Sequence, residues 1–354
     1  MENNKQIQKA GDNSQQIQAG VINNIIYQGI SEQRAREICL EIAKKAIEEN
    51  TAGALEIANK RLDEFKSILI PDIEKIEKNF NSFSDPAFQI LLKKAQLTAA
   101  CTERSYDYKI LAELLAHRIE NKSSIKKKAS ITKVVEILDQ IDDDALCGLT
   151  TYYSVKKFVP TGSSMNDCLS KLNYLFGEIM YMDLPVGYNW IDHLELLGMI
   201  RTFPYNEINK LPYCLRENFG GYICTGIRKN SENYRKVLEI IDSNNIPQDI
   251  LVDNEFCNDY TRLNIVNKFS IDGRYNKNQR KALHDIWSMY EQNSRLQKKI
   301  EEKFNEQFSS YQKLSELKHW WNNISPYFIL TSAGDVLAHV NAKRCYNKLP
   351  IFDR

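Results

Sequence analysis

The spacing of apolar residues along most of the chain is that of helices. From residue 31 onward, apolar positions recur every three or four residues. Such stripes occupy 35–46, 55–69, 73–80, 88–95, 111–115 and 131–141. Ser31 is a suitable N-cap for the first stripe, and Pro71 is expected to end the second. The pattern predicts an antiparallel array of helices over 31–143.

The remainder of the chain is less regular but also mainly helical. Helical spacing is found at 164–180, 190–197, 232–242 and from Lys277 past Phe308, and a strand is expected over 222–227. No convincing repeat of 20–50 residues is found, which argues against a regular solenoid.

One small sheet is expected to join two distant segments. Residues 199–202 follow a helix and Gly198, and residues 327–330 run into Thr331 or Ser332, each a good N-cap. Neither segment has a hairpin partner nearby, so we expect them to pair with each other. Gly334 would let the following helix pack closely. This order of elements resembles that of winged-helix domains, and a winged-helix-like β element is therefore part of the prediction.

The first thirty residues have a different pattern. They hold eleven Asn or Gln, and a period of two places Ile17, Ala19, Val21, Ile25 and Tyr27 on one face, interrupted by Asn23. This alternation predicts a strand, and an unpaired apolar strand tends to pair with another chain. We therefore expect these five residues to be buried between subunits, with Gln16, Gln18 and Asn24 forming amide ladders. A poorly ordered tail is the alternative, since termini are often not tied down.

The predicted fold is thus mainly α, a helical bundle or array with two short β elements. Three regions are expected: a β assembly segment (1–30), a helical domain (31–143) and a mainly helical domain with a small sheet (144–354).

Composition narrows the function classes. Lys and Arg number 47 and Asp and Glu 46, a balance that argues against broad binding to nucleic acid. No run reaches the ~18 apolar residues of a membrane span, and no secretory signal is visible. The eight cysteines lack zinc-site spacing, so reduced thiols and a cytoplasmic location are expected. Neither GxxxxGK[ST], GxGxxG nor GxSxG occurs.

A few polar groups were weighed as chemical sites. Asp192, His193 and Glu195 diverge around a helix, and Asp142–Asp144 is read as a solvated loop. Arg280 and His284 lie four residues apart and resemble the Arg–His pair of helical ribonucleases, although the spacing differs. Lys126–Lys128 is too short for a nucleic-acid footprint and fits a solvated helix start. No enzyme activity, metal or cofactor is expected.

The two ends of the chain carry the most specific strings. Residues 8–20 read QKAGDNSQQIQAG, residues 29–31 read GIS, and residues 330–341 read LTSAGDVLAHVN. They resemble a group of uncharacterised bacterial cytosolic proteins with an N-terminal QxxGDNSxxIQA segment and a C-terminal LTxxGxxLAxxN segment. The N-terminal string also resembles the amyloid-signalling motifs of prokaryotic immune proteins. These resemblances imply a bacterial setting, often in mobile-element or anti-phage neighbourhoods, and no activity.

We therefore expect a noncatalytic interaction protein that assembles into a homo-oligomer of three or more chains through its N-terminal β segment. Another protein of the same defence system is a further expected partner, whereas a membrane and nucleic acid are not. Two alternatives were kept: a helical nuclease or toxin-like effector using Arg280, His284 and His193, and a winged-helix regulator. The segment 190–197 carries no arginine or lysine to reach bases, which weakens the second.

Overall fold

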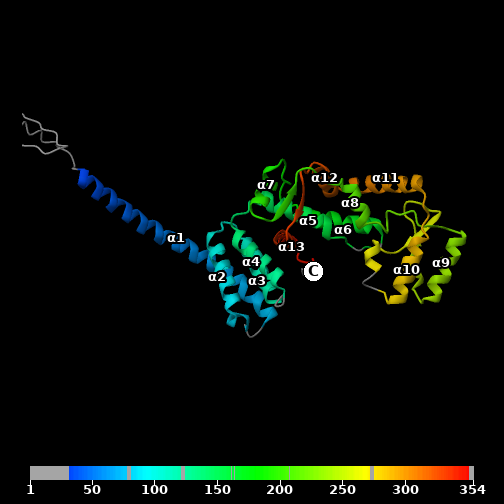
Figure 1. Cartoon of the computed structure of the whole chain (residues 1–354), viewed down its shortest axis with the longest axis horizontal. Coiled ribbons are helices and arrows are strands. Elements are labelled where there is room, and N and C mark those ends of the chain that lie inside the picture. Colours follow the sequence, from blue (N-terminus) through cyan, green and yellow to red (C-terminus); the bar gives the residue numbers. More distant parts are fainter. Residues whose placement is uncertain are drawn as a thin grey trace, which may run out of the picture. The chain divides into compact units, whose positions relative to one another are not determined.

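The computed structural model describes residues 32–77, 81–120, 124–160, 162, 164–206, 208–271 and 275–350, and for 32–50 it describes the backbone alone (Figure 1). The chain divides into two compact units, Met1–Glu56 and Ile57–Arg354. The prediction of three regions, 1–30, 31–143 and 144–354, is not tested by this division.

The described part is mainly helical, as predicted. Its α-helices are α1 (Glu32–Ile76), α2 (Pro86–Cys101), α3 (Asp107–Glu120), α4 (Ile125–Ile137), α5 (Asp143–Lys157), α6 (Met165–Ile179), α7 (Asn189–Leu196), α8 (Leu211–Asn218), α9 (Glu232–Ser243), α10 (Lys277–Ser288), α11 (Ser294–Ser310), α12 (Gln312–Trp321) and α13 (Ser332–Cys345). Short 3-10 turns occur at Asn81–Ser84, Gln248–Ile250 and Lys268–Ile271. The helix predicted from Lys277 onward is divided between α10 and α11.

The pairing predicted between the two distant segments is confirmed. Strand β1 (Ile200–Phe203) runs antiparallel to β5 (Tyr327–Leu330), with Ile200 opposite Leu330 and Phe203 opposite Tyr327. The two strands form a two-stranded sheet between α7 and α13.

Thr331 and Gly334 fix the start of α13 beside this sheet. Thr331 is the N-cap: its Oγ1 accepts a hydrogen bond from Gly334 N at 3.1 Å and donates to Gly198 O at 2.8 Å. A Cβ at Gly334 would lie 2.0 Å from Met199 O, so only glycine permits this approach. The predicted roles of both residues are therefore confirmed.

A second sheet was not predicted. The short strands β2 (Ile227–Arg228), β3 (Leu251–Asp253) and β4 (Tyr260–Leu263) form it in the antiparallel order β2-β4-β3. The expectation of one small sheet was wrong, and of the strand expected at 222–227 only Ile227 belongs to β2. Strands of two to four residues are too short to establish a period of two in the sequence.

Helix α1 also differs from the prediction, because its backbone continues through Pro71 to Ile76. The prediction treated the stripes at 35–46 and 55–69 as separate helices and took Pro71 as the end of the second. Phe65, Leu69 and Ile73 are all buried on one face, and their burial on both sides of Pro71 offsets its cost.

Two hydrophobic cores stabilise the unit Ile57–Arg354. The larger core contains the buried faces of α2 to α8 and α11 to α13, together with Phe65, Leu69 and Ile73 of α1. Helix α13 is buried on nearly all sides and packs mainly on α5 and α4. The smaller core is formed by α9, α10 and the three-stranded sheet, and Figure 1 shows α9 beside α10. Among the described residues, no helix has the length and hydrophobicity to cross a membrane.

Candidate functional site

The residues predicted to join subunits lie outside the described residues. This applies to the apolar face and to the amide ladder, that is, to Ile17, Ala19, Val21, Ile25, Tyr27, Gln16, Gln18 and Asn24. Their role stays a prediction.

The first described side chains after this segment form an uncovered part of α1. Leu55 and Ala58 lie on the helical face that is buried farther on at Phe65 and Leu69, yet Leu55 is 58% exposed. Ile57, on a neighbouring face, is 54% exposed. Within the described residues, the apolar face of α1 therefore extends beyond its buried part. We refer to Ala54, Leu55, Ile57 and Ala58 as the open stripe.

Arg61 lies where α1 begins to contact α2. Its Nη1 donates to the carbonyl oxygens of Ala100 and Cys101, at 2.9 and 3.0 Å. These carbonyls belong to the last turn of α2, where helical acceptors have no partner within the helix. Arg61 thus caps α2, and Phe65, one turn later, is buried.

The polar groups of α7 have local structural roles. His193 Nε2 lies 3.1 Å from Gln140 O and 3.3 Å from Asp142 N, and Glu195 accepts hydrogen bonds from Thr202 N and Oγ1. Glu195 therefore fixes the turn from α7 into β1. Within the described residues, no group of three His, Cys, Asp or Glu side chains has the arrangement of a metal site.

Arg280 and His284 lie on α10, at the second core. Leu283, between them, is fully buried in that core. Both Arg280 and His284 have interaction partners. His193 lies on α7, whose apolar residues belong to the larger core. The structure therefore places the three ribonuclease-like candidates at two different cores.

The acidic run at 142–144 begins helix α5 instead of forming a solvated loop. Asp142 is the N-cap and accepts from Ala145 N. Asp143 forms an ion pair of 2.9 Å with Arg104 Nη1 and accepts from Tyr106 Oη. Carboxylates at a helix N-terminus are favoured by the helix dipole, which explains the run.

Arg104 is the centre of a network that the sequence did not indicate. Its guanidinium donates to Leu138 O and Ile141 O and pairs with Asp107 at 3.0 Å. Asp107 is fully buried, and burial raises the pKa of its carboxyl group although Thr102 and Arg104 stabilise the charged form. The network fixes the turn between α4 and α5 against the start of α3.

A second polar cluster lies where α3, α5 and α13 meet. Glu113 pairs with Lys343 and lies 3.1 Å from His117, while His339 Nδ1 lies 3.1 Å from Tyr153 Oη. Burial would raise the pKa of Glu113, but hydrogen bonds from His117 and Lys343 outweigh it and lower the pKa to about 2. Burial lowers the pKa of His339 to about 4, so the ring is neutral near pH 7. These groups come from segments far apart in sequence and share no motif spacing.

The largest of the described cavities, about 640 Å³, lies where the two cores meet. Ile223 of the larger core and Tyr290 of the smaller one line it, together with the first turn of α11. Arg216 and Glu301 form an ion pair of 3.2 Å at its wall, and Gln297 Nε2 donates to Ile223 O and Glu301. These three side chains therefore bind one another at the cavity wall.

Comparison with known proteins leaves the function open but shows a family. No curated protein and no solved structure matches the chain. A protein-family model, whose description names no activity, matches residues 29–352. Since the match spans most of the chain, the protein belongs to that family.

Proposed function

We propose that the protein is a noncatalytic interaction protein that assembles with copies of itself through residues 14–28 and the adjoining part of α1. The observation that carries the proposal is the open stripe, which continues the buried face of α1. This helix begins at Glu32, four residues after the segment predicted to form intersubunit strands. The occupant of the stripe is the same stripe of a second copy, because paired N-terminal segments would bring the following helices together in parallel.

The energetics favour such a contact over a solvated stripe. Complete burial of one Leu or Ile side chain contributes ~1.5–3 kcal/mol. Leu55 and Ile57 are both more than half exposed in the single chain, so most of this free energy is available only on association. Strand pairing within residues 14–28 would add backbone hydrogen bonds that one isolated strand cannot form.

The noncatalytic part of the proposal rests on the roles of the polar groups. His193 and Glu195 hold turns of the backbone, and Arg104, Asp107 and Asp143 bind one another. The bacterial setting, the link to anti-phage defence and a partner from the same system follow from the resemblance at the two ends of the chain. The nuclease alternative has no observation of its own that favours it. The pairing of β1 with β5 fits a winged-helix-like element, but residues 190–197 carry no arginine or lysine to reach bases.

Sedimentation equilibrium of three proteins tests the assembly: the full chain, a chain lacking residues 1–28, and Ile17→Asp/Ile25→Asp. We expect the full chain to form an oligomer of three or more copies, and both changed proteins to be monomers with unchanged helical circular dichroism. A truncated protein that keeps the stoichiometry of the full chain would show that assembly lies elsewhere.

The contribution of α1 has a test of its own. Leu55→Glu in the full chain is expected to weaken association by at least tenfold. Leu196→Glu is the matched control, since Leu196 is 80% exposed on α7 and lies outside the proposed interface. Equal effects of the two substitutions would exclude the open stripe from the interface.

A further inference from the structure

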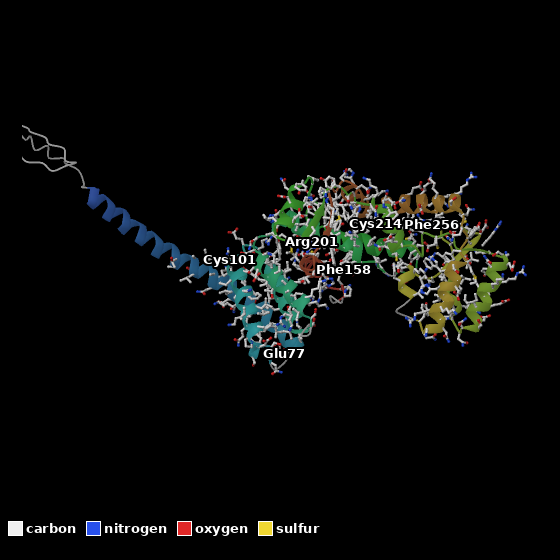
Figure 2. All side chains as sticks on the ribbon, in the orientation of Figure 1. Glu77, Cys101, Phe158, Arg201, Cys214 and Phe256 are labelled. Atoms are coloured by element: carbon white, nitrogen blue, oxygen red, sulfur yellow. The ribbon has the colours of Figure 1, made fainter. Side chains whose placement is uncertain are left out.

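A cavity of about 330 Å³ lies between the end of α5, helix α8 and the start of β5. Stacked aromatic rings form one wall: Tyr152 and Trp321 lie 4.9 Å apart at an interplanar angle of 9°. Cys214, labelled in Figure 2, lies on the α8 side of the cavity. The volume is that of a small-molecule pocket, and its wall is about equally polar and apolar.

Lys156, an exposed residue near the end of α5, brings a positive charge to this cavity. Its Nζ donates to Tyr152 Oη at 2.7 Å, and Tyr152 Oη in turn donates to Phe328 O. Nζ also lies 4.4 Å from the centre of the Tyr152 ring and 5.8 Å from that of Tyr327. Among the described residues, no carboxylate forms an ion pair with it. Partial desolvation lowers the pKa of Lys156, although Cys214 and Asp335 act to raise it.

Glu217 brings the opposite charge to the same cavity. Lys156 and Glu217 are its only lining residues with formal charges in the described part of the chain, and the two do not pair with each other. The Cys214 thiol lies near both: burial raises its pKa, Lys156 lowers it and Glu217 raises it. The two charges therefore reach the cavity from different helices, Lys156 from α5 and Glu217 from α8.

Tyr327 adds a hydroxyl group to the wall. The described residues include no hydrogen-bond partner for its Oη, and its ring faces Lys156. Asn218, by contrast, already donates its side-chain amide to Val155 O at 3.0 Å. The groups left for a ligand are thus one ammonium, one carboxylate and one hydroxyl, beside an aromatic wall.

We propose that this cavity binds a small zwitterion of the amino-acid class, with its carboxylate on Lys156, its ammonium group on Glu217 and an apolar side chain on the aromatic wall. Only a ligand with both charges satisfies both residues. A simple anion would leave Glu217 beside its negative charge, and a simple cation would leave Lys156 unmatched. The volume suits a single amino acid better than a longer peptide. This proposal does not depend on self-assembly.

Isothermal titration of the full chain tests it with L-leucine and L-phenylalanine as zwitterions, 3-phenylpropanoate as the anion and 2-phenylethylamine as the cation. We expect an amino acid to bind at least tenfold more tightly than the anion or the cation. Lys156→Met and Glu217→Gln should each weaken binding of the amino acid at least tenfold. Lys156→Met should not weaken binding of 2-phenylethylamine, because this cation has no carboxylate for Lys156 to hold and is repelled by its charge.

Lys157→Met and Glu239→Gln are the matched controls, since both residues are exposed, as Lys156 and Glu217 are, but neither lines the cavity. Circular dichroism establishes that each variant is folded, and Tyr327→Phe provides a milder variant that is expected to weaken binding. Three outcomes would overturn the proposal. They are no binding of either amino acid at millimolar concentration, equal binding of the anion with no effect of Glu217→Gln, and equal losses in the control variants.

Discussion

Gly334 decides how closely α13 can approach β1. A Cβ on this residue would lie 2.0 Å from Met199 O, and a backbone atom cannot move aside as a side chain can. Gly334→Ala should therefore destabilise the protein by about 1–3 kcal/mol. Gly177 in α6 has open space around the same position, so Gly177→Ala should stabilise it by ~0.5–1 kcal/mol. Urea denaturation measures the change in the free energy of unfolding for both variants. A Gly334→Ala variant as stable as the unchanged protein would contradict the close contact.

Glu113 makes stability depend on pH in acid. Its pKa is about 2 in the folded chain and 4.5 as the ordinary value, so its charged form is stabilised by folding. That contribution is present above pH 4.5, is lost as the pH falls toward 2, and amounts to at most about 3 kcal/mol. Glu113→Gln should flatten the stability curve in this window.

Stability should also decline as the pH falls from 6.5 to 4, because the pKa of His339 is lowered from 6.5 to about 4 in the folded chain. This second decline should remain in Glu113→Gln. Urea denaturation at intervals of pH separates the two windows. Glu239→Gln, at an exposed site on α9, serves as the control. An unchanged decline below pH 4.5 in Glu113→Gln would show that other carboxylates cause it.

At the scale of elements, Pro71 is the weak point of α1. It lies inside the helix, where it has no N–H to donate and its ring crowds the preceding turn, at a cost of ~3 kcal/mol. Pro71→Ala should stabilise the protein by about 1–3 kcal/mol, less any gain in unfolded-state entropy. Glu74→Ala, exposed in the same part of the helix, should change stability by less than ~0.5 kcal/mol. A loss of stability in Pro71→Ala would mean that the ring makes a packing contact.

The sequence was most informative at positions where a single physical requirement, such as a helix cap or a close backbone approach, selects one kind of residue. Thr331 as a cap and Gly334 as a point of close approach are such residues. The pairing of β1 with β5 followed from the lack of a nearby hairpin partner for either strand. Where burial comes from distant contacts, the sequence was silent. Arg262 in β4 is 2% exposed and Arg104 binds carbonyls of a later loop, and neither position has a periodic signal. The cavity at Lys156 is likewise assembled from α5, α8 and β5, which no motif connects.

At the scale of the whole molecule, the two separate cores predict two levels of cooperativity in the unit Ile57–Arg354. Leu283 in α10 belongs to the smaller core and Leu337 in α13 to the larger, and both are fully buried. Each Leu→Ala substitution removes comparable contacts and should destabilise its own core by ~2–5 kcal/mol.

The two substitutions should speed hydrogen exchange in different parts of the unit. Leu283→Ala is expected to speed exchange in β2, β4, α9 and α10 while leaving α3, α5 and α13 protected. Leu337→Ala should speed exchange in the helices around α13 and in the smaller core as well, because the chain passes directly from one core to the other at Ile223–Cys224 and at Ile265–Val266. Uniform acceleration across the unit in Leu283→Ala would show that the two cores unfold as one.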